Sequence, residues 1–133
     1  MSAFESAIQQ AHSAVEAVAG AVMTYRVGGE AGEPIVVTMV PGVTRHGGTN
    51  GAGEMVVLSR SRDFLVESAD LIDGNGAAVV PDEGDVIEWI KGGVRRKYLV
   101  TRPEGAQGCW RWADHRETRR RVHTDFYDEE VVP

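Results

Sequence analysis

Cysteine and histidine, the side chains that most often bind transition metals or take part in nucleophilic catalysis, are few in this 133-residue sequence and are widely spaced. Cys109 is the only cysteine, and its neighbours in residues 108–112 offer it neither a general base nor an oxyanion site. The histidines lack the His-x-x-x-His or Cys-x-x-Cys spacing of common metal sites; they are His12, His46, His115 and His123. We therefore predict no metal, no cofactor and no catalytic centre, with Cys109 as a small, partly buried apolar side chain.

Carboxylates and glycines gather in patterns that are typical of turns. Asp82, Glu83 and Asp85 flank Gly84 and precede an apolar run, as in a polar turn that leads into a strand. An acid–base role would require burial that this context does not imply. The 16 glycines form neither a P-loop nor a strand followed by G-x-G-x-x-G and a helix. We expect them to serve turns.

An arginine-rich stretch beside two tryptophans raises the question of nucleic-acid binding, because arginine contacts phosphates and tryptophan stacks on bases. The net charge of −6 and the isoelectric point near 5.2 argue against a dedicated nucleic-acid binder. On a strand, Trp110 and Trp112 would point to one face and act as core or interface anchors. We predict a protein interface that contains both tryptophans and four arginines, Arg116, Arg119, Arg120 and Arg121. Solvated surface, or nucleic-acid binding through residues 111–121, is the alternative.

Charge is distributed unevenly along the chain. Residues 94–124 hold nine basic and three acidic residues, whereas residues 125–133 hold four acidic residues and no basic one. Residues 60–93 hold eight acidic and three basic residues. Patches of opposite sign favour head-to-tail contact between copies of a chain. Folding could equally intermix these charges within one subunit.

The elements that would position these residues begin with an amphipathic helix over residues 1–20. Residues 2–5, Ser-Ala-Phe-Glu, have the form of a capping box, and Gly20 is a plausible C-terminal stop. Apolar residues recur at spacings of three and four and fall on one face; they are Phe4, Ile8, Ala11, Val15 and Val18. This face needs a partner, so Phe4, Ile8 and Val15 join the predicted interface.

A β-rich body is predicted over residues 21–127. Residues 21–27 and 35–40 are expected to pair across a Gly/Pro turn, and residues 86–90 and 94–101 across Lys91-Gly92-Gly93. Residues 109–113 and 120–127 form the last pair. The five glycines of residues 41–54 predict a flexible loop before short strands at 55–59 and 63–66. The acidic tail, residues 128–133, is predicted to fray.

Together these elements predict one domain over residues 1–133, mainly β, as a small β-barrel or sandwich with one N-terminal amphipathic α-helix. No alternating β-α-β pattern or internal repeat occurs. No run approaches the roughly 20 apolar residues that a membrane-spanning helix needs, and the first residues lack a secretory signal. We expect a chain that is made in the cytoplasm and has no membrane partner.

Residues 63–124 carry an ordered set of short motifs. They are Asp63-Phe64-Leu65-Val66, Ala69-Asp70-Leu71, Pro81 with Gly84-Asp85-Val86-Ile87, Tyr98-Leu99-Val100, Cys109-Trp110-Arg111-Trp112-Ala113-Asp114 and Arg121-Val122-His123-Thr124. This set, over nearly half of the chain, resembles the head-tail joining proteins of tailed bacteriophages and prophages, which are also called head completion, stopper or neck proteins.

The resemblance implies a virion structural protein of the neck, assembled in the host cytoplasm. It implies a homo-oligomeric β-barrel ring that connects portal or adaptor proteins to the tail, through which DNA passes without sequence-specific binding. It brings no catalytic residues, so we expect no enzyme activity. Few phosphate contacts would suit a channel in which DNA slides. The alternatives are a nucleic-acid-binding module, another phage tail assembly protein, or a small enzyme that uses Cys109 or the histidines.

Overall fold

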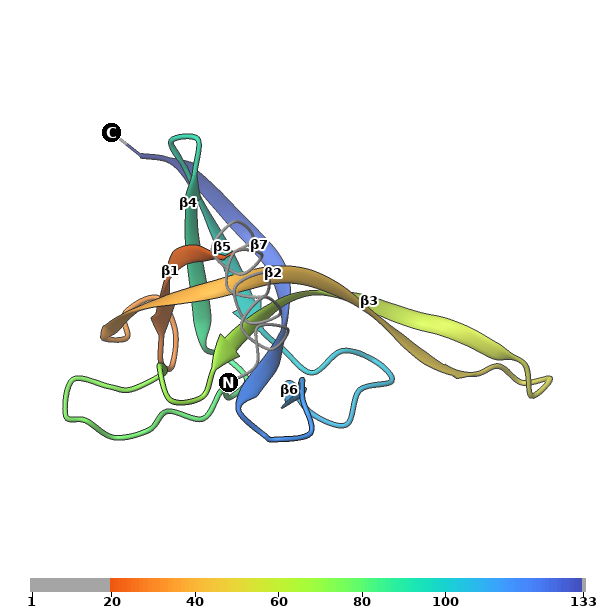
Figure 1. The fold of residues 1–133 in the computed structure, drawn as a ribbon. Coiled ribbons are helices and arrows are strands. Elements are labelled where there is room, and N and C mark those ends of the chain that lie inside the picture. Colours follow the sequence, from red (N-terminus) through yellow and green to blue (C-terminus); the bar gives the residue numbers. More distant parts are fainter. Residues whose placement is uncertain (1–19, 133) are drawn as a thin grey trace, which may run out of the picture.

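The computed structural model describes residues 20–132, which form a single antiparallel sheet of seven strands (Figure 1). Its strands are β1 (Ala21–Arg26), β2 (Pro34–Thr49), β3 (Met55–Glu67), β4 (Val86–Lys91), β5 (Val94–Val100), β6 (Trp110–Trp112) and β7 (Arg119–Val131). The strand order is β3-β2-β1-β4-β5-β7-β6, and β3 also pairs with β7. The prediction of a mainly β fold is confirmed. The predicted helix, with Phe4, Ile8 and Val15, lies outside the described residues.

The turn chemistry of the sequence correctly located three of the β-hairpins. β1 and β2 pair from Ala21↔Met39 to Arg26↔Pro34 on either side of the predicted turn. β4 and β5 are joined by Gly92 and Gly93, whose φ angles of 61° and 77° fit a tight turn that favours glycine. β6 pairs with β7 as expected. Local residue types were sufficient here because β-rich runs flank each of these connections.

The predicted flexible loop over residues 41–54 is wrong for most of its length. β2 continues to Thr49, and β3 runs from Met55 to Glu67 as one strand, so only residues 50–54 form the turn. Main-chain ladder bonds need no side chain, so Gly47 and Gly48 are accommodated in β2, with a register shift between His46 and Gly47. The side-chain oxygen of Asn50 accepts hydrogen bonds from the amides of residues 52 and 54 and closes the turn.

The predicted frayed tail is also wrong, because β7 continues to Val131. It pairs with β5 in a register that places Arg96 opposite Glu129 and Arg95 opposite Glu130. The guanidinium of Arg95 lies 2.6 Å from the carboxylate of Glu130. The acidic end of the chain is held against the basic strand β5 by main-chain pairing and opposite charge.

An apolar core packs against the strands of the sheet. Phe64, which is fully buried, makes edge-to-face ring contacts with Tyr98 at 5.0 Å and Trp89 at 6.4 Å between centroids. The other buried apolar residues come from every strand except β6, from the residue just before β6 and from the 68–85 connection; they include Met23, Tyr25, Ile35, Val37, Met39, Val66, Leu71, Ile87, Val100, Cys109 and Val122. Cys109 is a buried apolar side chain as expected, and burial raises the pKa of its thiol.

Asp85 departs from the expectation that the carboxylates of residues 82–85 are exposed. It is 2% exposed and accepts hydrogen bonds from the Tyr25 hydroxyl and from the amides of Gly28 and Asp82. Burial, followed by this carboxylate, raises the pKa of Tyr25. Asp85 therefore fixes two turns against β1 and satisfies buried donors. Within residues 20–132, no helix is long and apolar enough to cross a membrane.

One part of the sheet projects beyond this body. β1 pairs with β2 only up to Met39, and β7 pairs with β3 only from Arg62 onward. Residues 40–49 of β2 thus pair only with β3, and residues 55–61 of β3 pair only with β2; we call this two-stranded ribbon, residues 40–61, the arm. Figure 1 shows the arm extending to one side of the body, while the connection at residues 68–85 extends to the other.

Candidate functional site

Six polar side chains meet where the arm leaves the body. They come from β2, β3 and β7, and we call them the clamp: Thr44, His46, Ser61, Asp63, Arg121 and His123. Strand register explains their meeting, because Thr44 lies opposite Ser61 and Asp63 lies opposite His123. Alternate residues of a strand share a face, so Ser61 and Asp63 point to the same side.

Asp63 is the centre of the clamp and is completely buried. Its Oδ1 accepts hydrogen bonds from Ser61 at 2.5 Å and from His123 at 3.0 Å. Its Oδ2 accepts hydrogen bonds from Thr44 and from Arg121, the latter at 3.1 Å. Both oxygens of this carboxylate are therefore saturated by donors from the arm and from β7.

The protonation of the clamp follows from this geometry. Burial raises the pKa of Asp63, but the hydrogen bonds from His123, Ser61 and Thr44 outweigh it and leave that pKa below its usual value. Burial lowers the pKa of His46, and the electrostatic interaction with the neighbouring His123 ring lowers it further. At neutral pH the clamp thus contains an ionised carboxylate and a neutral His46.

Two histidines and an aspartate within 4.8 Å of one another also resemble a metal-ligand set. The hydroxyl of Ser61, however, lies among the three ligand atoms, 2.8 Å from His46 Nε2, 2.5 Å from Asp63 Oδ1 and 3.4 Å from His123 Nδ1. A bound cation would have to displace this hydroxyl and would lie near the Arg121 guanidinium. The geometry therefore favours a hydrogen-bonded structural network.

The same hydroxyl does not have the geometry of an activated nucleophile. Ser61 is 3% exposed and donates its proton to the Asp63 carboxylate. In a serine nucleophile, the hydroxyl donates to an imidazole that acts as general base. Here the Ser61 hydroxyl already donates its proton to Asp63, so His46 is only a second hydrogen-bond partner of the Ser61 oxygen. The clamp holds strands together.

A cavity of about 330 Å³ opens beside the clamp. His46, His123, Trp110 and Arg111 line it, together with the loop at residues 105–108. A second, shallower depression adjoins it and is lined by Val43, Thr44, Arg45, Arg111 and Arg121. Small-molecule sites are mainly apolar concavities, whereas these hollows are lined by several cationic groups. They are better suited to acidic groups than to an apolar ligand.

The tryptophans of the predicted interface lie on one face, as expected, and a buried arginine packs against both rings. Trp110 and Trp112 meet edge to face at 5.0 Å, and the Arg120 guanidinium carbon lies 4.7 Å and 5.0 Å from their ring centroids. Arg120 is 8% exposed and donates a hydrogen bond to the Val79 carbonyl oxygen. The alternative of a solvated surface therefore does not hold for Arg120, because this cation–π contact buries its guanidinium.

The other predicted arginines divide between internal and external roles. Arg119 donates a hydrogen bond at 2.6 Å to Glu67, and Arg121 belongs to the clamp. Arg116 is exposed. The structure thus brings Arg120 to the tryptophans and Arg121 to Asp63, and leaves Arg116 apart from both. Whether these residues contact a partner stays a prediction.

Sequence reasoning missed the clamp because it placed its residues in separate elements. Thr44 and His46 fell in the predicted flexible loop, and Ser61 fell between two predicted strands. The alternation Ser59-Arg60-Ser61-Arg62-Asp63 was the available signal, since it places small or acidic residues on one face and arginines on the other. Tertiary pairing with β7 then supplied Arg121 and His123.

Comparison with known proteins assigns the chain to a family. The family model described as phage head-tail joining protein matches residues 1–131, nearly the whole sequence. No curated protein matches the chain significantly. The resemblance inferred from the ordered motifs of residues 63–124 is confirmed. The chain belongs to the phage head-tail joining protein family.

Proposed function

We propose that the protein is a non-enzymatic structural subunit of the phage neck that forms a closed homo-oligomeric ring between head and tail. The family match supports the joining role and contact with head and tail components. The ring, its position between portal or adaptor and tail proteins, and its assembly in the host cytoplasm are parts of the proposal. A closed β-barrel body is a further part, supported by the pairing of β3 with both β2 and β7.

The single observation that carries the ring is the arm. A two-stranded ribbon is marginally stable in water by itself, and its edges expose unpaired main-chain groups. The arm also exposes large apolar side chains, with Met55 80%, Val43 59% and Val57 54% exposed. Such a feature requires a protein partner, and in an assembly of identical subunits a neighbour is always available.

Passage of DNA through the ring fits the charge of the chain. The net charge is −6, and the arginines of β5 and β7 are largely engaged by neighbouring carboxylates or rings. A channel with few free cations makes few phosphate contacts and lets the duplex slide. We propose that DNA passes without sequence-specific binding.

Electron microscopy tests the proposal. The purified chain, alone and mixed with portal and tail proteins of the same phage, should form rings with an opening wide enough for duplex DNA. Phage particles that lack the protein should contain filled heads and separate tails. Particles that join heads to tails without this protein would contradict the proposal.

The alternative of nucleic-acid binding has one observation in its favour, the depression lined by Arg45, Arg111 and Arg121. Retention on DNA that decreases steeply with salt would support it. The tryptophans argue against base stacking, because Arg120 lies against both rings. We expect weak retention on DNA at physiological salt, and strong retention there would favour the alternative.

A further inference from the structure

We propose that the arm of one subunit docks on the acidic connection, residues 68–85, of the next copy of this chain. The inference rests on the proposed ring and identifies the contact that builds it. It replaces the simpler expectation that the basic block of residues 94–124 faces a neighbour's acidic surface.

That basic block is unsuited to the role because folding neutralises much of it within the subunit. Arg95 pairs with Glu130, Lys97 with Glu30 at 2.7 Å, and Arg119 with Glu67. Arg120 is buried under the tryptophans, and Arg121 is bound to Asp63. Charges already satisfied inside a subunit contribute little attraction to a neighbour.

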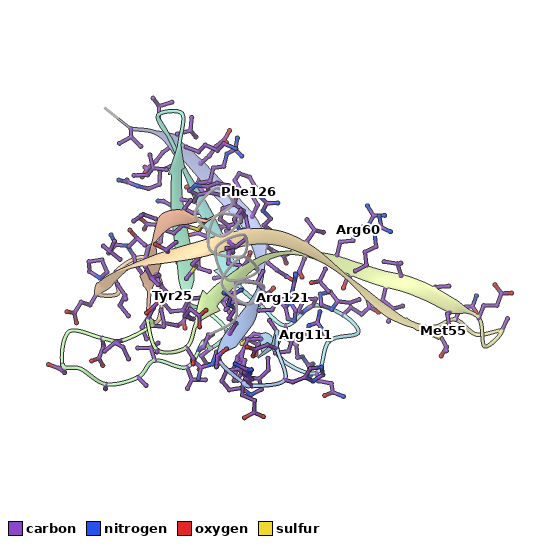
Figure 2. All side chains as sticks on the ribbon, viewed as in Figure 1. Tyr25, Met55, Arg60, Arg111, Arg121 and Phe126 are labelled. Carbon is purple, nitrogen blue, oxygen red and sulfur yellow. The ribbon has the colours of Figure 1, made fainter. Side chains whose placement is uncertain are left out.

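The arm, by contrast, carries cations in an unfavourable arrangement. Arg45 lies directly opposite Arg60 in the β2–β3 register, so the two side chains share one face, and both are exposed. Among residues 20–132, neither has a carboxylate within ion-pair distance. Like charges in directly opposed positions destabilise a sheet. Figure 2 shows Arg60 projecting from the arm and Met55 near its tip.

The complementary surface lies on the other side of the body. Residues 68–85 contain five carboxylates and no lysine, arginine or histidine. Asp70 and Asp82 are exposed there, and among residues 20–132 neither is in an ion pair. Apolar Val80, 54% exposed, lies in the same connection. This segment therefore offers an acidic and partly apolar surface to a basic and partly apolar ribbon.

The positions of the two surfaces determine the kind of assembly. The arm and the 68–85 connection extend from opposite sides of the body (Figure 1), so one subunit cannot satisfy its own arm. Unlike surfaces on opposite sides make a heterologous, head-to-tail contact, and repetition of that contact closes a ring when the rotation permits. The clamp then acts as the fixed base that directs the arm toward the neighbour.

Charge reversal and charge exchange test the contact. The first variant is Arg45→Glu/Arg60→Glu, the second is Asp70→Lys/Asp82→Lys, and the third combines all four substitutions. A matched control, Lys91→Glu/Arg96→Glu, reverses two exposed cations of the β4–β5 hairpin, outside both the arm and the 68–85 connection. Sedimentation velocity at low and high ionic strength measures self-association of the purified chain. Separately, bismaleimide cross-linking of the Met55→Cys/Asp70→Cys variant measures contact between neighbouring subunits in assembled necks.

The first and second variants should each weaken self-association at least about tenfold at low salt, the combined variant should restore it, and the control should resemble the parent. The cysteine pair should cross-link between subunits into ladders. A parent that forms rings while the arm variants associate normally overturns the arm contact alone. Loss in the first variant without rescue by exchange also overturns it, and assigns the arm to DNA or another neck protein. A parent that remains monomeric in solution and in necks overturns the ring as well.

Discussion

The body and the arm share strands β2 and β3, but only in the body do these strands pack against other strands and a core. In the body, β3 lies between β2 and β7 and contributes Phe64 and Val66 to the core. In the arm, the same strand has one neighbour and exposes Met55 and Val57. The polar clamp around Asp63 lies at the boundary. The comparison indicates that the body is complete within one chain, whereas the arm is built for contact outside it.

The largest expected effect belongs to the body. Phe64→Ala removes a fully buried ring that contacts Tyr98 and Trp89 and should lower the free energy of unfolding by about 3–5 kcal/mol. Urea denaturation measures this change. Met55→Ala, at an 80% exposed arm position, is the control and should change stability by less than about 0.5 kcal/mol. Equal losses in the two variants would show that the arm is packed in the monomer.

The next effect concerns the clamp. Asp63→Asn removes the buried negative charge that accepts hydrogen bonds from Arg121 and His123 and should cost about 3 kcal/mol, because the half-buried Arg121 guanidinium loses its charged partner. Hydrogen exchange should show faster exchange of the arm amides in this variant, since the arm loses its base. Asp73→Asn, in an exposed turn, is the control. If arm exchange is unchanged, the clamp does not direct the arm.

Acidification should lower the free energy of unfolding through the clamp, because the pKa values of His46 and Asp63 are lowered in the folded chain. The lowered pKa of His46 means that the folded chain binds fewer protons than the unfolded chain, whose histidine titrates near pH 6.5. The contribution of His46 to the free energy of unfolding is therefore fully present above about pH 6.5. It is lost as the pH falls from there through the pKa of His46 in the folded chain. The lowered pKa of Asp63 adds a further loss below about pH 4.

Unfolding measured at a series of pH values checks this dependence. His46→Gln keeps a hydrogen-bonding group near Ser61 but cannot titrate, so the decrease just below pH 6.5 should shrink in this variant. His115→Gln, at an exposed position, should behave like the parent. An unaltered pH profile in His46→Gln would assign the titration to another group.

The smallest expected effect is a gain in stability, whereas the Phe64→Ala and Asp63→Asn variants lose stability. Arg60→Glu replaces a repulsive cross-strand pair with an attractive one opposite Arg45 and should stabilise the isolated subunit by about 0.2–1 kcal/mol. Chemical denaturation at low salt is the measurement, and high salt should remove the gain. A loss of stability would mean that Arg60 already has a favourable partner within the subunit, which would weaken the case for an intermolecular role of the arm.

The sequence by itself determined the features that depend on neighbouring residues. Gly92 and Gly93 predicted a tight turn, and the spacing of Trp110 and Trp112 predicted that both rings lie on one face. The ordered motifs of residues 63–124 were sufficient to identify the family. These predictions succeeded because turn geometry and strand alternation are local properties of the chain.

Only the tertiary structure decided which distant residues meet. The glycines of residues 41–54 predicted a loop, yet main-chain pairing between β2 and β3 extends the strands through Gly48. Four arginines of similar appearance in residues 116–121 received different environments, because strand register placed Arg120 against Trp112 and Arg121 near Asp63. Register is set by the packing of the whole sheet, and a shift of one residue would exchange its two faces. The clamp and the arm are consequences of that register.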